Sequence, residues 1–223
     1  MQSYQVRDAA KKSAKTIINT DIVRLKSPDF AIASGHLAAA FSQDPLISYF
    51  LPEDTAAKPR ALKHLSKAFL KFAQPYGHVY TTANDPKGVA IWLPPEAFQM
   101  TFSQIWRAIT SGLITSPLYL RWTQIIDFIS LVNTETQLHS RLSPEPHWYL
   151  GMLGVSPRCQ GQGIGGRLLQ PVLEKANRTK MPCYLETTTT AAVKFYQRHG
   201  FEVVHQGAFA GHEYWAMKRY PKS

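Results

Sequence analysis

Hydrophobic positions recur at two different spacings along the chain, and these spacings predict where helices and strands lie. Between Ala57 and Gln74 the apolar residues fall three or four positions apart, which is the period of one helix face. The stretches GVAIWLPP and PCYLETT are instead short and continuously apolar, as buried strands are. We therefore expect helices over residues 31–42, 57–74, 164–178 and 191–200, and strands over residues 21–27, 78–83, 88–95, 147–155, 182–188, 201–207 and 212–220.

The order of these elements predicts a single α/β domain with a mixed sheet. One strand, two helices and two strands are followed by a mainly helical insert, residues 96–142, and then by strand, helix, strand, helix and two strands. The domain is expected to occupy residues 20–223. Residues 1–19 are polar and basic and are interpreted as an N-terminal tail or frayed helix. Prolines bound DPLISYFLPED, residues 44–54, and we expect a turn there.

The charge balance favours an anionic partner. The 223 residues carry 25 Lys and Arg against 15 Asp and Glu, and the net charge of +10 suits nucleic acid, a membrane surface or a phosphorylated coenzyme. No nucleic-acid-binding signature accompanies this charge. Proline and charged residues interrupt the most apolar stretch, LITSPLYLRWTQIIDFISLV, which is therefore expected to form buried helices and not a membrane span.

Cysteine usage and the N-terminal sequence bear on the compartment. Cys159 and Cys183 have no metal-ligand spacing, and the N-terminal residues lack the apolar run of a signal peptide. We expect a cytoplasmic protein with no metal site and with neither a nucleic-acid nor a membrane partner.

The stretch RCQGQGIGGRLLQ, residues 158–170, combines clustered glycines with the start of an amphipathic helix, a combination typical of phosphate-binding loops. A Walker A loop is disfavoured because Arg167 and Leu168 stand where that motif needs Lys and Ser or Thr. A dinucleotide fingerprint is an alternative, since Gly161, Gly163 and Gly166 spell G-x-G-x-x-G. Against it, five residues separate the preceding strand from the first glycine, and little chain remains for a doubly wound sheet.

A third template, Q/R-x-x-G-x-G/A, is filled by Gln160–Gly165. With its flanking segments YLGMLGV, GGRLLQPVLEKA and YLETTTTAAVKFYQRHGFEVV, this loop resembles the GNAT superfamily of N-acetyltransferases. The resemblance extends over about residues 20–219. In AAAFSQDPLISYFLPED and GVAIWLPP it is closest to the puromycin N-acetyltransferase-like branch. It implies an acyl-CoA N-acyltransferase fold, with a mixed, mostly antiparallel sheet of splayed strands flanked by helices.

The resemblance implies acetyl-CoA as co-substrate, and the loop chemistry agrees. Glycines at 163 and 165 let backbone N–H groups converge on a diphosphate, and the helix from Ile164 presents its positive dipole end. The backbone of the preceding strand is expected to pair with the pantetheine arm. Many family members place an asparagine seven residues before the tyrosine; Thr189 stands there instead. The expected coenzyme-binding residues are Leu153, Gly154, Val155, Arg158, Gln160, Gly161, Gln162, Gly163, Ile164, Gly165, Gly166, Arg167, Thr189 and Tyr196.

The family carries out direct attack of an amine in a ternary complex, which needs a proton donor and a proton acceptor. Tyr196 matches the family tyrosine, a general acid for the departing thiolate, while Phe195 beside it is expected in the core. Glu186, on a buried strand, is expected as the base, as a binding carboxylate or as half of a structural salt bridge. His147 is a second candidate base.

Aromatic residues of PLISYFLP, AIWLPP and the insert predict a cleft for the primary amine of a small molecule. Protein or peptide amines, and a non-catalytic acetyl-CoA-binding sensor, remain alternatives. The protein is expected to be a monomer or a homodimer.

Overall fold

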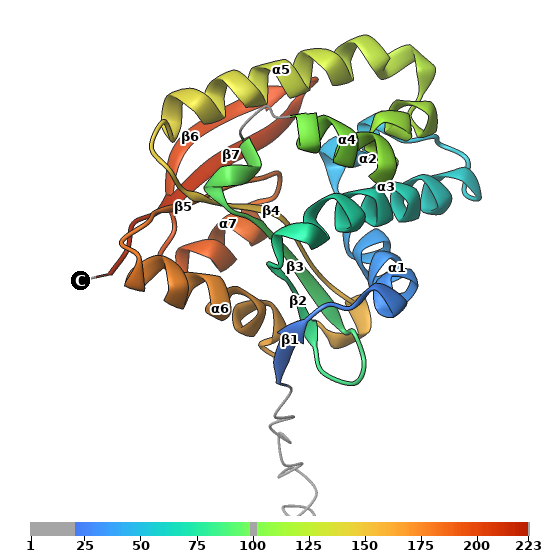
Figure 1. The fold of residues 1–223 in the computed structure, drawn as a ribbon. Coiled ribbons are helices and arrows are strands. Elements are labelled where there is room, and N and C mark those ends of the chain that lie inside the picture. The colour runs from blue at the N-terminus through green and yellow to red at the C-terminus, as the bar shows by residue number, and fades with distance from the viewer. Residues whose placement is uncertain (1–20, 99–101, 223) are drawn as a thin grey trace, which may run out of the picture.

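The computed structural model describes residues 21–98 and 102–222. Its centre is a seven-stranded sheet in the order β1-β2-β3-β4-β5-β7-β6 (Figure 1). Every neighbouring pair is antiparallel except β4 and β5. The strands are β1 (Ile22–Arg24), β2 (Val79–Thr82), β3 (Gly88–Leu93), β4 (Trp148–Val155), β5 (Cys183–Thr187), β6 (Glu202–Phe209) and β7 (His212–Arg219).

The parallel strands β4 and β5 separate after two residue pairs. Trp148 lies opposite Cys183, and Tyr149 lies opposite Tyr184. Beyond these pairs β4 is joined to β3 as far as Val155, and β5 is joined only to β7. The facing backbone groups of β4 and β5 therefore lack a partner strand near the middle of the sheet. The expected α/β class, with a mostly antiparallel sheet and splayed strands, is confirmed.

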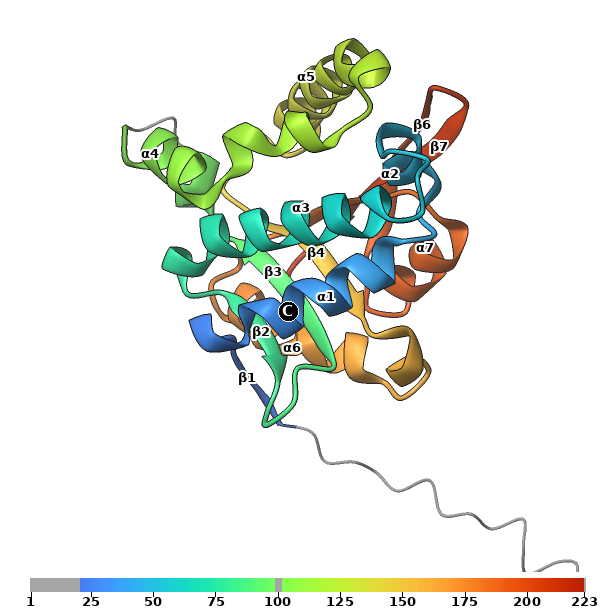
Figure 2. The same ribbon diagram turned by 90° about the vertical axis from the view of Figure 1, so that its right-hand side faces the viewer.

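Helices cover both faces of the sheet (Figure 2). Alternate residues of β3 serve two cores, because side chains along a strand point to opposite faces. Ala90 and Trp92 pack with α6 and α7, whereas Val89 and Ile91 pack with α1 and α3. The long helices are α1 (Phe30–Phe41), α3 (Ala57–Ala73), α5 (Ile125–Leu142), α6 (Ile164–Arg178) and α7 (Thr190–Gln197).

Helix α6 forms where the apolar period predicted it. Leu168, Leu169 and Val172 are completely buried against the sheet, and each such side chain contributes roughly 1.5–3 kcal/mol by leaving water. Helix α5 covers the other face beside α3, where Leu138 packs with Tyr184 and Tyr214. The sheet is thus enclosed on both sides of the point where β4 and β5 part.

Two glycines of β4 let the helices approach its backbone. A Cβ at Gly151 would lie 2.6 Å from the Phe69 ring, and one at Gly154 would lie 2.9 Å from the Leu37 side chain. Helix α1 therefore approaches β4 closely at Gly154. Next to Gly151 the register against β3 shifts between Ile91 and Trp92, which marks a β-bulge.

The turn expected over residues 44–54 is wrong, because Pro45–Phe50 forms a short helix, α2. Pro45 occupies the first helical position, which needs no backbone donor, and the Asp44 carboxylate accepts a 2.8 Å hydrogen bond from the Ile47 amide. A proline that was interpreted as a breaker therefore starts a helix.

The insert is mainly helical, as expected. It contains most of a 3₁₀ segment at Pro95–Phe98, then α4 (Phe102–Ser111), two further 3₁₀ segments (Leu113–Tyr119 and Trp122–Gln124) and α5. Pro117 lies inside the 3₁₀ segment Leu113–Tyr119. The Tyr49 hydroxyl donates a 2.6 Å hydrogen bond to Asp127, which joins α5 to α2. The interpretation of residues 1–19 as a tail lies outside the described residues.

Candidate active site

The glycine-rich loop joins β4 to α6 and turns sharply twice. Gly161 and Gly163 both have φ of +75°, in the left-handed region that glycine adopts without strain. Gly163 is also the residue that precedes the first turn of α6. The Gln160 side chain donates a 3.2 Å hydrogen bond to the Val155 carbonyl, which ties the loop back to the end of β4. The amides at the start of α6 are thereby presented together.

The next two glycines make room for α7 and the turn after it. A Cβ at Gly165 would lie 3.2 Å from the Phe195 ring, and one at Gly166 would lie 2.8 Å from the His199 ring. Because these positions carry no side chain, the first turn of α6 packs against α7. Gly161 and Gly163 therefore allow the sharp turns of the loop, whereas Gly165 and Gly166 allow close packing against α7 and the turn after it.

A cavity of about 770 Å³, which we call the loop cavity, lies between this loop and α7. It brings together most of the residues that the sequence predicted for the coenzyme. Its cationic side chains are Arg167 and Arg198, and no carboxylate lines it within the described chain. The predicted residues that line it are Leu153, Val155, Gln160, Gly161, Gly163, Ile164, Gly165, Gly166, Arg167 and Tyr196.

Four predicted coenzyme residues are not among those lining this cavity. Gly154 faces α1, and Arg158 and Gln162 are exposed on the outside of the loop. The Thr189 hydroxyl accepts a 3.2 Å hydrogen bond from the Ala192 amide and so caps α7. The contact expected of Thr189 therefore has no support in this arrangement.

Tyr196 lines the loop cavity and is deeply buried. Its ring is 7% exposed and packs edge-on against Phe201 at 5.7 Å. Burial raises the pKa of Tyr196, so that its hydroxyl keeps its proton at neutral pH. Phe195, which was assigned to the core, is only partly buried and also lines the cavity.

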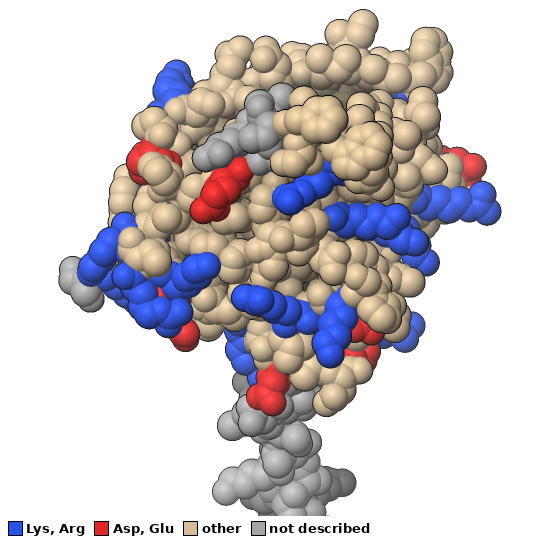
Figure 3. Space-filling view, viewed as in Figure 1, with Lys and Arg blue, Asp and Glu red and all other residues tan. Residues whose placement is uncertain are grey.

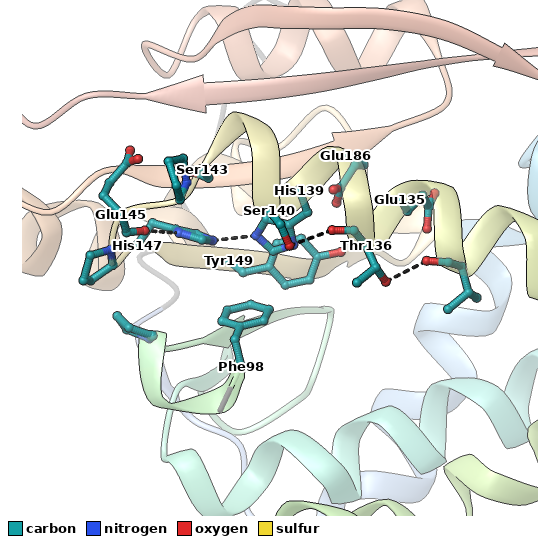
Figure 4. Close-up of a pocket in the computed structure, with 14 residues that line it drawn as sticks. Phe98, Glu135, Thr136, His139, Ser140, Ser143, Glu145, His147, Tyr149 and Glu186 are labelled. Carbon is teal, nitrogen blue, oxygen red and sulfur yellow. Dashed lines mark hydrogen bonds between the residues drawn. The ribbon is translucent and has the colours of Figure 1, made fainter. Parts of the chain in front are cut away.

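Glu186 does not lie with Tyr196; it lines a second cavity of about 690 Å³, which we call the carboxylate cavity (Figure 4). Helix α5, the segment before β4 and the separating strands β4 and β5 enclose this space. His147, the second candidate base, lies in the same cavity. Its lining residues are Pro95, Phe98, Val132, Glu135, Thr136, His139, Ser140, Ser143, Pro144, Glu145, Pro146, His147, Tyr149 and Glu186.

Glu186 is tuned toward proton exchange near neutrality. Burial raises the pKa of its carboxyl to about 7, and the negative charge of Glu135 acts in the same direction. The hydroxyls of Tyr149 and Tyr184 partly oppose this rise in pKa. Burial likewise raises the pKa of Glu135 to about 7. The salt-bridge interpretation of Glu186 is not supported, since neither ion pair found among the described residues involves it.

His147 takes part in a hydrogen-bonded histidine pair. Its Nδ1 lies 2.7 Å from the Glu145 carbonyl oxygen, so Nδ1 carries the proton and Nε2 is the acceptor. His139 Nε2, at 2.6 Å, then donates to His147 Nε2. Burial lowers the pKa of His139 to about 4 and also lowers the pKa of His147. Both rings are therefore neutral at pH 7. His147 is nevertheless a weak base, because its pKa is lowered and its Nε2 already accepts the hydrogen bond from His139.

The sequence pattern did not single out Glu135, His139 and Tyr149. Glu135 and His139 lie four residues apart on α5 and so point to the same side of the helix. This four-residue spacing is the sequence feature from which Glu135 and His139 could have been predicted to lie together. In the described chain no group of three or more His, Cys, Asp or Glu residues is placed to hold a metal ion.

Comparisons with known proteins agree with this geometry. Residues 118–203 match the acetyltransferase (GNAT) domain model. An uncharacterized N-acetyltransferase of Schizosaccharomyces pombe is 24% identical over 183 residues, which cover 80% of this chain and 72% of the relative.

Two solved structures share the fold. A Corynebacterium glutamicum protein, histone acetyltransferase HPA2 and related acetyltransferase, has a TM-score of 0.60 at 20% identity, covering 92% of this chain and 97% of its own. The Drosophila melanogaster polyamine N-acetyltransferase has a TM-score of 0.53 at 18% identity, covering 90% of this chain and 100% of its own.

The fold is therefore that of the GNAT acetyltransferases, and the domain match and the curated relative support an N-acetyltransferase enzyme. GNAT acetyltransferases use acetyl-CoA as co-substrate. The dinucleotide-binding alternative is incompatible with the mostly antiparallel sheet, because that fingerprint belongs to a doubly wound parallel one.

Proposed function

We propose that this protein transfers the acetyl group of acetyl-CoA to the primary amine of a cationic small molecule, by direct attack in a ternary complex. The observation that carries the proposal is the position of Glu186. Its carboxyl, with a pKa of about 7, lines a cavity rich in carboxylates where β4 and β5 separate. The loop cavity is lined by Leu153 and Val155 of β4, one of these two strands, and by residues of α6 and α7.

The coenzyme is assigned to the loop cavity. Backbone amides from Gly161 to Gly166, with the positive end of α6 and the Arg167 guanidinium, suit a pyrophosphate. Leu153 and Val155 line the same cavity from the free edge of β4. Backbone groups on that edge are available to the amide groups of a pantetheine arm, as a neighbouring strand would use them.

The acceptor is assigned to the carboxylate cavity. Ionised Glu186 takes one proton from the ammonium group of the acceptor, either directly or through water, and leaves a neutral nucleophilic nitrogen. Glu135 provides a second carboxylate at the same end of the cavity (Figure 4). A ligand with a second cationic group would therefore be bound more tightly than one with a single amine.

The bonds and protons balance without an acyl-enzyme. The amine nitrogen attacks the thioester carbonyl carbon, the new C–N bond forms and the C–S bond breaks. The Tyr196 hydroxyl, kept protonated by its raised pKa, donates a proton to the departing thiolate and regains one from the attacking nitrogen through solvent. Glu186 releases the proton that it took from the ammonium group to solvent, which completes the cycle.

Size and lining support a small acceptor with an apolar part. A volume of about 690 Å³ suits a small molecule, and Phe98 and Val132 add apolar surface beside the carboxylates. The resemblance to the puromycin N-acetyltransferase-like branch supports an acceptor with an aromatic or apolar group. One solved relative is a polyamine N-acetyltransferase, which agrees with a cationic acceptor.

A thiol-release assay with acetyl-CoA tests this proposal. Arylalkylamines, linear diamines and polyamines, and lysine-containing peptides are compared at equal concentration. We expect turnover of the small amines, and faster turnover of diamines than of monoamines of equal length. Turnover of peptides alone would show that the acceptor is a protein, and coenzyme binding without any turnover would favour a sensor.

A further inference from the structure

The outer surface of the helical insert is far more apolar than the rest of the described surface. We define the insert face as the exposed apolar side chains of residues 102–132. Four of them are more than four-fifths exposed: Phe102 at 83%, Leu118 and Trp122 at 82%, and Ile126 at 81%. The whole set is Phe102, Ile105, Trp106, Ile109, Ile114, Leu118, Tyr119, Trp122, Ile126, Ile129 and Val132.

The apolar residues of α4 point away from the core. Phe102, Ile105, Trp106 and Ile109 recur at the spacing of one helix face, and all four are exposed. A surface helix normally turns such a stripe inward. On α5, Ile126 and its neighbours form a second outward stripe, while Leu131 and Leu138 face the core. So many exposed large apolar side chains on one segment are typical of an interaction site.

A band of positive charge borders this face. Helix α3 carries exposed Arg60, Lys63, Lys67 and Lys71 at helical spacing, and its sequence AKPRALKHLSKAFLKFA contains no acidic residue. Figure 3 shows blue side chains gathered over α3, below an uncharged area over α4 and much of α5. The band adjoins the insert face directly, because the His64 ring of α3 stacks on the Tyr119 ring at 3.8 Å.

We propose that the insert face docks on the surface of a bilayer that contains anionic phospholipid. Exposed Trp, Phe, Leu and Ile side chains would enter the headgroup region while the α3 cations contact lipid phosphates and carboxylates. No helix among the described residues could itself cross a bilayer, so the contact is peripheral. A second copy of the chain is a poorer occupant, since a symmetric contact through this face would bring two α3 bands together.

The proposal departs from the expectation of no membrane partner. That expectation came from the absence of an uninterrupted apolar span, which surface docking does not require. Val132 and Phe98 are partly exposed and line the carboxylate cavity, so the mouth of that cavity adjoins the insert face. The docking proposal nevertheless does not depend on the proposed reaction.

Tryptophan fluorescence gives a readout that is confined to this face. Of the five tryptophans, Trp92, Trp148 and Trp215 are at most 7% exposed, whereas Trp106 and Trp122 are 58% and 82% exposed. The full chain is titrated with vesicles of phosphatidylcholine alone and of phosphatidylcholine mixed with phosphatidylserine. We expect a blue shift and cosedimentation with the mixed vesicles only, both weakened by high salt.

Three variants identify the surface that binds. Replacing Leu118 and Trp122 together by serine is expected to weaken cosedimentation at least about tenfold, because two exposed apolar groups are lost. Tyr220→Ser, at a residue that is 58% exposed outside the insert face, is the matched control and is expected to bind normally. Replacing Lys63, Lys67 and Lys71 by glutamine is expected to reduce binding to anionic vesicles by about tenfold or more.

The proposal would be overturned by an absence of cosedimentation with anionic vesicles at high lipid concentration. Undiminished binding of the Leu118→Ser, Trp122→Ser double variant would also overturn it. So would a dimer in analytical ultracentrifugation that this double variant dissociates, because a second copy would then be the occupant. Circular dichroism of each variant shows whether the fold is intact.

Discussion

The loop cavity and the carboxylate cavity both border β4, yet their charges are opposite. The loop cavity is lined by Arg167 and Arg198 and by no carboxylate, within the described chain. The carboxylate cavity is lined by three glutamates and by no lysine or arginine, within the same residues. One of those glutamates, Glu145, is paired with Lys218, which leaves Glu135 and Glu186 to set the charge.

The opposite charges of the two cavities suit the two ligands of the proposed reaction. A diphosphate needs convergent N–H groups and cations, whereas an ammonium group needs carboxylates and must lose a proton. If the two lay in one cavity, each would be attracted to the wrong partner. Under the proposed function, the coenzyme and the acceptor occupy the two cavities and the reacting atoms would meet where β4 and β5 separate.

The largest effect on catalysis is expected from removing the carboxylate of Glu186, the proposed base in the carboxylate cavity. Glu186→Gln should lower kcat/KM by about 10²- to 10⁴-fold, because no general base remains at that position, while the dissociation constant of acetyl-CoA stays near the wild-type value. Steady-state kinetics and calorimetric titration measure the two quantities.

Thermal unfolding provides the control for this variant. A carboxyl whose pKa is raised on folding stabilises the fold only while it is protonated, and this stabilisation is lost as the pH rises from about 4.5 to about 7. At pH 8, Glu186→Gln should therefore melt no lower than the wild type. A rate within threefold of wild type would exclude Glu186 as the base.

A smaller effect is expected from placing a negative charge in the loop cavity, where it would oppose the binding of an anionic ligand. Gly163→Glu should weaken acetyl-CoA binding on the order of 10²- to 10³-fold, because a carboxylate would repel the pyrophosphate. Gly163→Ala is the matched control: it has the same unfavourable φ of +75° but no charge. Equal affinities of the two variants would show that backbone strain, and not charge, weakens binding.

Tyr196→Phe tests whether the Tyr196 hydroxyl, in the loop cavity, donates the proton to the departing thiolate. We expect kcat to fall about 10²-fold, at the low end for general acid catalysis, with acetyl-CoA affinity retained. The ring stays in its buried position, so stability should change little. The fall in kcat should be smaller for acyl donors whose leaving thiol is more acidic, because such a thiolate needs less help from a proton donor. An equal fall in kcat for all donors would contradict the role of Tyr196 as general acid.

The smallest effect is a shift of a pH profile. The acid limb of kcat/KM should lie near pH 7 and rise with pH, because Glu186 acts when ionised and its pKa is about 7. Glu135→Gln removes the neighbouring negative charge and should move this limb to lower pH. Since Glu135 also has a pKa of about 7, the wild-type limb reports the pair. If the acid limb lies at the same pH in Glu135→Gln as in the wild type, another group sets its position.

The loop cavity could be predicted from the sequence because its determinants are local. Gly161 to Gly166 and the helix that follows them are contiguous, and Tyr196 lies on the next helix along the chain. Periodicity also located α3 and α6 to within one residue of their ends. The α2 segment was misassigned, because Pro45 begins a helix there.

The carboxylate cavity could not be assembled in the same way. Phe98, Glu135, His147 and Glu186 come from four separate segments, and their proximity depends on how α5 crosses the sheet. The apolar pattern of α5 also misleads, because Ile126 and Ile129 are exposed while Leu131 and Leu138 are buried. The hydrophobicity of the insert predicted that it would be buried, but only some of its apolar side chains are buried.

A crystal structure of the protein with coenzyme A and a linear diamine tests the division between the two cavities most directly. The pyrophosphate should contact backbone amides between Gly161 and Gly166, and one amine nitrogen should lie within hydrogen-bonding distance of Glu186. A coenzyme bound on the α5 side of the sheet, or a diamine bound away from both Glu135 and Glu186, would contradict this division.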